Sequence, residues 1–383
     1  MISWLPRGRA EWGTAIGGVA ALVAFGWLAF QSPQQGMLSY LFAFVFFTGL
    51  AVGALALVMV HALTGGAWGD ALRPQWMAAA RTLPLQLILA LPILTEIRAL
   101  YGWDRADVLA RDPLLRAQSW YLNAPFFVAR TLCYFVLWLG LLLLLVRGIR
   151  QGAPADPQHR SSLLGVASAG LILYALSMLF ASTDWVMSLV PHWHSSMFAM
   201  MVSTGCMLGA AAMAILHLMF STDRTPVSTL LRLGDLGNLL LMFVLVWWYL
   251  AFMQYLTIWI ADLPAETVWY IPRTLTSWRA VAWVGIVLNL AVPFVVLLSR
   301  SAKRHRGWLG AVAAALLLGN LGNALWLVIP SFRPWGFELR WTDLLAPVGM
   351  GALWLCVYLG QYRAQRPLEC SPLAHGTLGS VSG

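Results

Sequence analysis

The sequence predicts an all-α membrane protein with about ten transmembrane helices, and three observations support that prediction. The chain has 383 residues, of which 60% are hydrophobic and only 10% are charged, whereas a soluble domain carries about 25% charged residues. Its mean hydropathy is +0.74. Several windows are longer than the roughly 20 apolar residues that a helix needs to cross a bilayer.

Apolar runs divide residues 1–362 into ten candidate spans joined by short loops. Their predicted bounds are 13–30, 37–62, 75–97, 120–146, 161–188, 195–220, 236–258, 278–299, 307–330 and 341–362. Because most loops are short, consecutive spans are expected to be antiparallel neighbours in one helical bundle. Residues 363–383 are rich in Gly and Ser and have no periodicity, which predicts a disordered cytoplasmic tail.

Lys and Arg residues divide unevenly between the two sets of loops. The larger set comprises Arg7, Arg9, Arg73, Arg147, Arg150, Arg160, Arg224, Arg232, Arg300, Lys303, Arg304, Arg306, Arg363 and Arg366. The smaller set comprises Arg98, Arg105, Arg111, Arg116, Arg273, Arg279, Arg333 and Arg340. Since positively charged loops stay in the cytoplasm, both termini are predicted to be cytoplasmic. The net charge of +9 therefore reflects topology, and nucleic acid is not an expected partner.

Three other features are typical of membrane proteins in general. The four cysteines are far apart, without a CxxC or CxxCH motif, which indicates neither a disulfide framework nor an iron–sulfur or c-type haem site. Small residues in GLAVGALA, GCMLGAAA and GNLGNA indicate close helix packing. Most of the 21 Trp residues fall near predicted interfaces, as in any aromatic belt, so the sequence assigns them no function.

The stretch STDWVMSLVPHWHSSM, at 182–197, gathers polar groups in an otherwise apolar region. Asp184 lies about one turn inside the fifth span, and His192 and His194 follow the helix break at Pro191. Three more charged residues lie at a similar depth on the predicted periplasmic side, namely Glu96, Arg130 and Asp343. The sequence thus predicts a polar cluster near this surface.

The burial of Arg130 follows from the cost of exposing a charge to lipid, which is at least about 2.5 kcal/mol. Arg130 is therefore predicted to point into the bundle and to pair with Asp184 or Glu96. Such a pair has two interpretations. It is a structural lock between helices, or it belongs to a quinone head-group site or proton path, because carboxylates and imidazoles exchange protons when burial shifts their pKa values.

A second group of polar residues lies near the predicted cytoplasmic boundary. His61 in the second span and His217 in the sixth fall at one depth, and Arg81 is close enough to snorkel to the same boundary. They are candidates for an inner proton path, with mid-depth stepping stones at Ser177, Asn289, Asn320 and Asn323. Two imidazoles on different helices are also compatible with a b-type haem, although histidines at helix ends are more often interfacial polar residues.

Three segments together resemble a known family: WYLNAPFFVARTLCYFVLW at 120–138, STDWVMSLVPHWHSSMFAMM at 182–201 and MQYLTIWIADLPAETVWYIPR at 253–273. They resemble the polysulfide-reductase-like (NrfD-like) membrane subunits of alternative complex III, the bacterial quinol:cytochrome c or quinol:acceptor oxidoreductase. The closer match is to the smaller, ActF-type subunit. The resemblance covers essentially all ten spans and is most specific in these segments.

The resemblance implies a ten-helix fold with two four-helix bundles related by pseudo-symmetry plus peripheral helices, and no metal or haem in this subunit. It also implies a multi-pass protein of the bacterial inner membrane, beside a sister NrfD-like subunit, an iron–sulfur subunit and c-type cytochromes, often with a terminal oxidase. In the larger sister subunit, the Asp that corresponds to Asp184 belongs to a periplasmic quinol site. The resemblance therefore implies menaquinol or ubiquinol as the ligand.

The expected function is that of a membrane subunit of a quinol-oxidising complex, without a redox centre of its own, whose polar cluster holds a quinone head group or conducts protons. Two alternatives stay open. A secondary transporter also places charges at mid-depth, but it commonly has discontinuous helices in corresponding positions of two halves, and the sequence indicates only the break at Pro191. A pure assembly subunit would use every polar group structurally.

Overall fold

The computed structural model describes residues 9–151, 157–221 and 233–369, and all regular structure in these ranges is helical. The first half contains α1 (Arg9–Gln31), α2 (Pro33–Thr64), α3 (Ala67–Ala80), α4 (Leu83–Thr95), α5 (Ile97–Leu100), η1 (Gly102–Asp104), α6 (Ala106–Arg111), α7 (Pro113–Ala117), α8 (Ala124–Gln151), α9 (Pro157–Trp185) and η2 (Met187–Leu189). The second half contains α10 (Phe198–Phe220), α12 (Leu233–Ala261), α13 (Pro264–Thr267), α14 (Ile271–Leu275), α15 (Trp278–Ile286), η3 (Val287–Ala291), α16 (Val292–Leu298), α17 (Arg300–Arg304), α18 (Arg306–Val328), η4 (Ile329–Ser331) and α19 (Trp341–Glu369).

Ten helical segments of the described chain are long and apolar enough to cross a membrane, and each overlaps one predicted span. They are Gly13–Gln31, Pro33–Thr64, Ala67–Thr95, Ala124–Ile149, Ser161–Leu189, Phe198–Phe220, Leu233–Ala261, Trp278–Leu298, Arg306–Ser331 and Trp341–Gln365. The prediction of an all-helical protein with ten apolar spans is therefore confirmed.

Some helix ends differ from the prediction for identifiable reasons. α8 begins after Asn123 because the side-chain oxygen of Asn123 accepts a hydrogen bond from the backbone N–H of Phe126 (3.0 Å) and so caps the helix. The third span is broken at Arg81 and Thr82, just before Pro84, which cannot donate a backbone hydrogen bond. α19 continues to Glu369, so the predicted tail begins inside a helix, and residues 370–383 lie outside the described residues.

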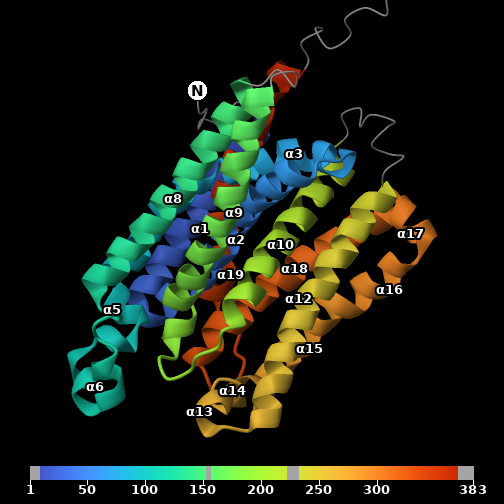
Figure 1. Ribbon diagram of the computed structural model, residues 1–383. Helices are drawn as coiled ribbons and strands as arrows, with labels where there is room; N and C mark the ends of the chain where they lie inside the picture. The colour runs from blue at the N-terminus through green and yellow to red at the C-terminus, as the bar shows by residue number, and fades with distance from the viewer. Residues whose placement is uncertain (1–8, 152–156, 222–232, 370–383) are drawn as a thin grey trace, which may run out of the picture.

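The helices pack around α2, which is buried along nearly its whole length (Figure 1). Its neighbours are α1, α3, α4, α9, α10, α18 and α19. α1 packs mainly against α19, so the first and last described helices lie side by side, while α10 connects α2 to α12 and α18. This arrangement puts α8 and α9 on one side of α2 and α12 to α16 on the other.

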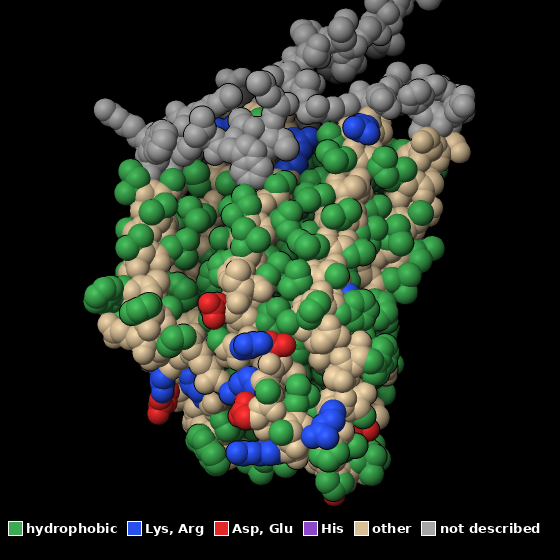
Figure 2. Space-filling model, turned by 90° about the vertical axis from the view of Figure 1, so that its left-hand side faces the viewer, with side chains coloured by type: hydrophobic (Ala, Val, Ile, Leu, Met, Phe, Trp, Pro, Cys, Tyr) green, Lys and Arg blue, Asp and Glu red, His purple; other side chains and the backbone are tan. Residues whose placement is uncertain are grey.

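The two ends of the molecule differ in structure. The short helices α5, α6, α13 and α14 lie at one end, the loop face, and the start of α1 and the end of α19 lie at the opposite end, the terminal face (Figure 1). On the side that Figure 2 draws, a broad band of hydrophobic side chains separates the two ends, and charged side chains gather toward the loop face. Such a surface is expected where apolar helices cross a bilayer.

The predicted close packing of small residues is present between α2 and α10. Gly49 and Gly53, spaced as in a GxxxG motif, both face Cys206 of α10. A Cβ at Gly53 would lie 2.2 Å from the backbone oxygen of Cys206, and one at Gly49 would lie 2.9 Å from its sulfur. The two helix backbones therefore approach one another at Gly53 more closely than any side chain would allow.

Candidate functional site

Of the two partners predicted for Arg130, Asp184 and Glu96, the structure shows Asp184. Arg130, in the second turn of α8, donates from Nε to Asp184 Oδ2 (2.8 Å) and from Nη2 to Oδ1 (2.9 Å). Tyr134, one turn further along α8, donates its hydroxyl to Oδ2 (2.6 Å). Asp184 is fully buried near the end of α9. A bidentate, hydrogen-bonded pair of this kind joins α8 to α9, as the sequence predicted.

The remaining contacts of Arg130 come from Tyr121, in the loop that precedes α8, and from Phe126, in the first turn of α8. Its Nη1 donates to the backbone oxygen of Tyr121 (2.9 Å). Its guanidinium lies 3.9 Å from the ring centre of Tyr121 and 4.2 Å from that of Phe126. The pair therefore fixes the position of Tyr121, and Asp184 itself has no exposed surface with which to touch a ligand.

Two residues predicted for this cluster are separate from it. Glu96 is exposed at the end of α4 and forms no ion pair with Arg130. Asp343 is buried at the start of α19, where Arg333 donates to both carboxylate oxygens (2.8 and 3.1 Å) and Ser39 of α2 donates to Oδ1 (2.6 Å). Glu96 and Asp343 therefore do not share the ion pair of Arg130 and Asp184.

A cavity of about 410 Å³ lies beside the Arg130–Asp184 pair, and we call it the loop-face cavity. Its lining residues include Trp120, Tyr121, Thr183, Ser188, Trp193 and His194. His194 is exposed, whereas the hydroxyl oxygen of Tyr121 and the indole nitrogen of Trp193 are buried and have no hydrogen-bond partner in the described chain. Leu179 and Phe180, which are 40% and 44% exposed, also line it. The cavity thus has an apolar side and an imidazole.

His192, two residues earlier, has a different role. Its Nε2 lies 2.6 Å from Oδ2 of Asp112, the residue that caps α7. This contact ties the turn between α9 and α10 to the loop that carries α6 and α7. His192 does not line the loop-face cavity, so of the two histidines of HWH one makes a loop contact and the other lines the cavity wall.

The carboxyl of Asp112 is expected to stay ionised at a pH below its ordinary pKa. The backbone N–H of Leu115, followed by His192, lowers the pKa of Asp112 below its ordinary value of 3.8. A carboxyl with a lowered pKa in the folded state contributes stability above its ordinary pKa, and that contribution is lost as the pH falls through the lower folded value. A carbon-13 titration of Asp112 should give a midpoint below 3.8. His192→Gln should raise it only in part, and a return to 3.8 would contradict the capping role of Leu115.

The residues predicted near the terminal face bond to protein groups. His61 Nε2 lies 3.0 Å from the oxygen of Gly66 and 3.5 Å from Asp70. His217 Nδ1 is hydrogen-bonded to the hydroxyl of Tyr358 on α19. Arg81 is partly exposed at the break between α3 and α4. In the haem interpretation, Nε2 of His61 would have to leave the oxygen of Gly66, whereas Nδ1 of His217 could keep its bond to Tyr358.

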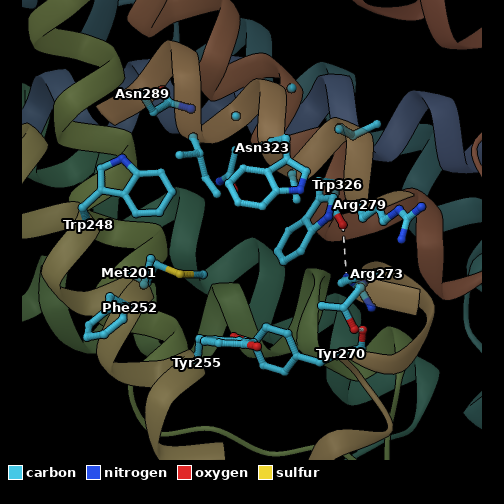
Figure 3. Close-up of a pocket in the computed structure, with 18 of the residues that line it drawn as sticks. Met201, Trp248, Phe252, Tyr255, Tyr270, Arg273, Arg279, Asn289, Asn323 and Trp326 are labelled. Carbon is cyan, nitrogen blue, oxygen red and sulfur yellow. Dashed lines mark hydrogen bonds between the residues drawn. The ribbon is translucent and has the colours of Figure 1, made fainter. Parts of the chain in front are cut away.

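A second cavity, of about 470 Å³, lies on the other side of the bundle, and we call it the aromatic cavity (Figure 3). The rings in its wall include Trp248, Phe252, Tyr255, Tyr270, Trp283 and Trp326. Its polar wall residues include Arg273, Arg279, Asn289 and Asn323. The sequence analysis missed this cavity because it attributed the Trp residues to an interfacial belt. The dense aromatic segment at 253–273 was the available signal.

Arg273 is a fully buried cation in the wall of the aromatic cavity. Its guanidinium donates to the backbone oxygens of Trp269 (2.7 Å), Leu327 (2.8 Å) and Trp326 (3.2 Å), and lies 3.7 Å from the ring centre of Trp269. Burial lowers the pKa of Arg273 to about 9, so it remains charged at neutral pH. Burial also raises the pKa of the neighbouring Tyr270 to about 12, which keeps its hydroxyl protonated.

Comparison with known proteins gives no family assignment. No protein-family model matches the chain, and no curated protein matches it. The function is therefore argued from the two cavities and from the three segments at 120–138, 182–201 and 253–273.

Proposed function

We propose that this chain is the membrane subunit of a quinol:acceptor oxidoreductase, without a redox centre of its own, and that the loop-face cavity holds the quinol head group. The observation on which the proposal depends is an imidazole, His194, in the wall of a cavity that also has an apolar side. The resemblance to NrfD-like subunits supports the same function. Two of the three segments that carry this resemblance contribute residues to the cavity wall, namely Tyr121 from the first and His194 from the second.

Oxidation of a quinol releases two protons and two electrons. In the proposed reaction, a ring hydroxyl gives its proton to the imidazole of His194, which passes it to water because His194 is exposed at the loop face. The second hydroxyl gives its proton to water at the same face. The two electrons pass to an iron–sulfur centre of a partner subunit. The isoprenoid tail leaves the cavity past Leu179 and Phe180.

The Arg130–Asp184 pair has a positioning role in this proposal. Arg130 bonds to the backbone of Tyr121 and packs against its ring, and Tyr121 lines the cavity. The pair therefore holds one ring of the cavity wall in place without touching the quinol. In the sequence analysis, Asp184 was a candidate member of the quinone site or proton path; here it acts only through Arg130.

The remaining parts of the proposal follow from the resemblance. The chain would lie in a bacterial inner membrane with both termini in the cytoplasm, which puts the loop face and its cavity on the periplasmic side. There it would meet a sister NrfD-like subunit, an iron–sulfur subunit and c-type cytochromes, and in some organisms a terminal oxidase. The quinol would be menaquinol or ubiquinol.

One structural observation favours the transporter alternative, and another speaks against it. Helix irregularities occur in the third span, at Arg81 and Thr82, and in the eighth, at Val287–Ala291. However, the backbone at the first site stays hydrogen-bonded, because Thr82 donates to Ala79 (3.0 Å) and accepts from Gln86 (3.2 Å). Transporters commonly use unwound carbonyls at such breaks to hold an ion, so the quinol function is the better supported.

The proposal predicts that His194→Gln lowers quinol oxidation at least tenfold. The reason is that a positioned general base contributes about 10²–10⁴-fold and Gln accepts no proton. The measurement is the quinol:acceptor rate of the complete complex purified from cells that express the variant. Copurified c-type haem and iron–sulfur centres show that the complex is assembled.

His192→Gln is the matched control, because it removes a neighbouring imidazole that contacts Asp112 and does not line the cavity. Its rate is expected to equal that of the unchanged complex. An unaltered rate for His194→Gln in an assembled complex would contradict the proposed site and favour a structural subunit. Equal losses for both variants would show that the turn, and not the cavity, matters.

A further inference from the structure

The aromatic cavity extends from the loop face to the middle of the eighth span. Arg279, in the first turn of α15, lines it at one end, and Asn289 of η3 and Trp248 of α12 line it at the other (Figure 3). The stretch from Arg279 to Asn289 rises about 15 Å in helical geometry. A bilayer has a hydrocarbon core roughly 30 Å thick. The cavity is therefore about as deep as the apolar part of one leaflet.

The cavity is open at the side that faces lipid. Phe252 and Tyr255 of α12 and Trp283 of α15 line it and are 55%, 43% and 64% exposed. These residues belong to the seventh and eighth spans, and side chains exposed along such spans contact the acyl chains of a bilayer. An apolar chain therefore enters the cavity sideways from the membrane, where it contacts rings and aliphatic groups.

Two positive charges lie at the loop-face end of the cavity. Arg273 is 1% exposed and bonds, within the described chain, to neutral oxygens from three backbone carbonyls and from Ser331. Arg279 is exposed, and its side chain has no hydrogen bond or ion pair in the part of the chain that the structure describes. Among the described residues that line the cavity, none is an Asp or a Glu. This end therefore attracts an anionic group.

The volume of the cavity selects a slender occupant. It is about 470 Å³. A helix about 10 Å across and about 15 Å long occupies roughly 1,200 Å³, so the cavity does not accommodate a transmembrane helix of a partner subunit. An acyl chain is narrower than a helix, and its flexibility lets it follow the wall that α12, α15 and α18 form. The shape, the apolar wall and the cations at one end together match a lipid with a charged head group.

We propose that the aromatic cavity binds a phospholipid with a net negative head group, from the leaflet on the loop-face side. One acyl chain lies in the cavity against α12 and α15, and the phosphate accepts hydrogen bonds from the guanidinium of Arg279 at the entrance. Arg273, whose guanidinium bonds to the backbone, adds positive charge without touching the lipid. A zwitterionic head group binds more weakly, because the described wall offers no carboxylate to its ammonium. The binding does not depend on the proposed quinol function.

The test uses the full-length chain in nanodiscs of phosphatidylcholine. The probe is phosphatidylglycerol that carries a diazirine at the end of one acyl chain, and the labelled peptides are mapped by mass spectrometry after illumination. We expect labelling in the peptides of α12, α15 and α18 that line the cavity. Labelling confined to other helices would overturn the proposal.

Unlabelled competitors separate the lipid from its parts. Phosphatidylglycerol should compete roughly fivefold better than a diacylglycerol with the same chains, since one nearby cation contributes about that factor to the binding of an anionic lipid. Phosphatidylethanolamine should also compete less well, and glycerol 3-phosphate, which has no chains, should not compete. Equal competition by the diacylglycerol or by phosphatidylethanolamine would indicate an unselective apolar groove. Competition by glycerol 3-phosphate would indicate a site for free phosphate, and either result would overturn the proposal.

Arg279→Gln tests the phosphate contact. It removes the charge at the entrance and should weaken competition by phosphatidylglycerol roughly fivefold, with little effect on competition by the diacylglycerol. Arg105→Gln is the matched control, because Arg105 is also an exposed arginine of the loop face but does not line the cavity. Equal affinities of the two variants for phosphatidylglycerol would contradict the assigned contact.

Gly285→Leu tests the position of the acyl chain. Gly285 of α15 lines the cavity, and a Cβ there would have nothing within 4 Å, so the larger side chain fills open space without a clash. Labelling of α12 and α18 should be largely lost. Gly140→Leu on α8 is the control, since a Cβ at Gly140 also meets nothing within 4 Å but Gly140 does not line the cavity. Undiminished labelling of Gly285→Leu, in protein with unchanged circular dichroism, would overturn the proposal.

Discussion

Arg130→Ala is expected to lower the free energy of unfolding by about 3–5 kcal/mol, the usual cost of removing one partner of a buried ion pair. The substitution leaves Asp184 fully buried with only the hydroxyl of Tyr134 as a side-chain donor. It also removes the guanidinium that packs against Tyr121 and Phe126. The measurement is an SDS titration of the chain in mixed micelles, followed by circular dichroism.

Arg98→Ala is the matched control for this experiment. Arg98 pairs with Asp104 at 3.2 Å, but its side chain is 83% exposed, so the pair is expected to contribute only about 0–1 kcal/mol. A second comparison replaces both partners, as Arg130→Met with Asp184→Leu. Because no charge is then left buried, this double variant should be more stable than Arg130→Ala. Equal losses for Arg130→Ala and Arg98→Ala would contradict the assigned burial.

The Arg130–Asp184 pair could be predicted from the sequence because lipid leaves few alternatives for a charge. A single Arg within an apolar span must turn inward and find a carboxylate, and Asp184 and Glu96 were the partners predicted for it. The sequence could not choose between them. The sequence gives the depth of a residue along its helix. It does not give the direction in which the side chain points, because that depends on how the helix is rotated in the bundle.

The same limit explains why Asp343 was grouped with Asp184. Both lie near the loop-face end of their helices, but Asp343 is held by Arg333 and Ser39 on the α2–α19 side of the molecule. Arg333 was counted as a loop cation in the sequence analysis. Its position beside a buried carboxylate depends on the fold of the connection between α18 and α19, which has no regular pattern to predict it.

The aromatic cavity could not be predicted for a different reason. Trp248, Trp283 and Trp326 belong to spans that are distant in sequence, and each has the spacing of an interfacial Trp. They line one cavity only because α12, α15 and α18 come together in the fold. Arg273 is also misleading in the sequence, because a cation in a polar loop is normally solvated, yet here it is 1% exposed.

Gly53→Ala is expected to destabilise the chain by about 1–3 kcal/mol, the typical cost of overpacking a well-packed core. The new Cβ would lie 2.2 Å from the backbone oxygen of Cys206 and 2.4 Å from its carbonyl carbon. Backbone atoms cannot rotate away, so α2 and α10 must move apart, and α2 is the helix on which most others pack. Gly53→Val should destabilise the chain more than Gly53→Ala, since two further methyl groups point into the same contact.

A series of three alanines tests this reasoning within one protein. At Gly49 the new Cβ would meet the sulfur of Cys206 at 2.9 Å, a side-chain atom that can adjust, so Gly49→Ala should cost less than Gly53→Ala. At Gly140 on α8 nothing lies within 4 Å, so Gly140→Ala should be neutral or slightly stabilising. The measurement is the SDS midpoint of each variant. We expect the loss of stability to be largest at Gly53, smaller at Gly49 and absent at Gly140, because each new Cβ meets a different atom. If helix propensity alone decided, all three substitutions would give the same small gain in stability.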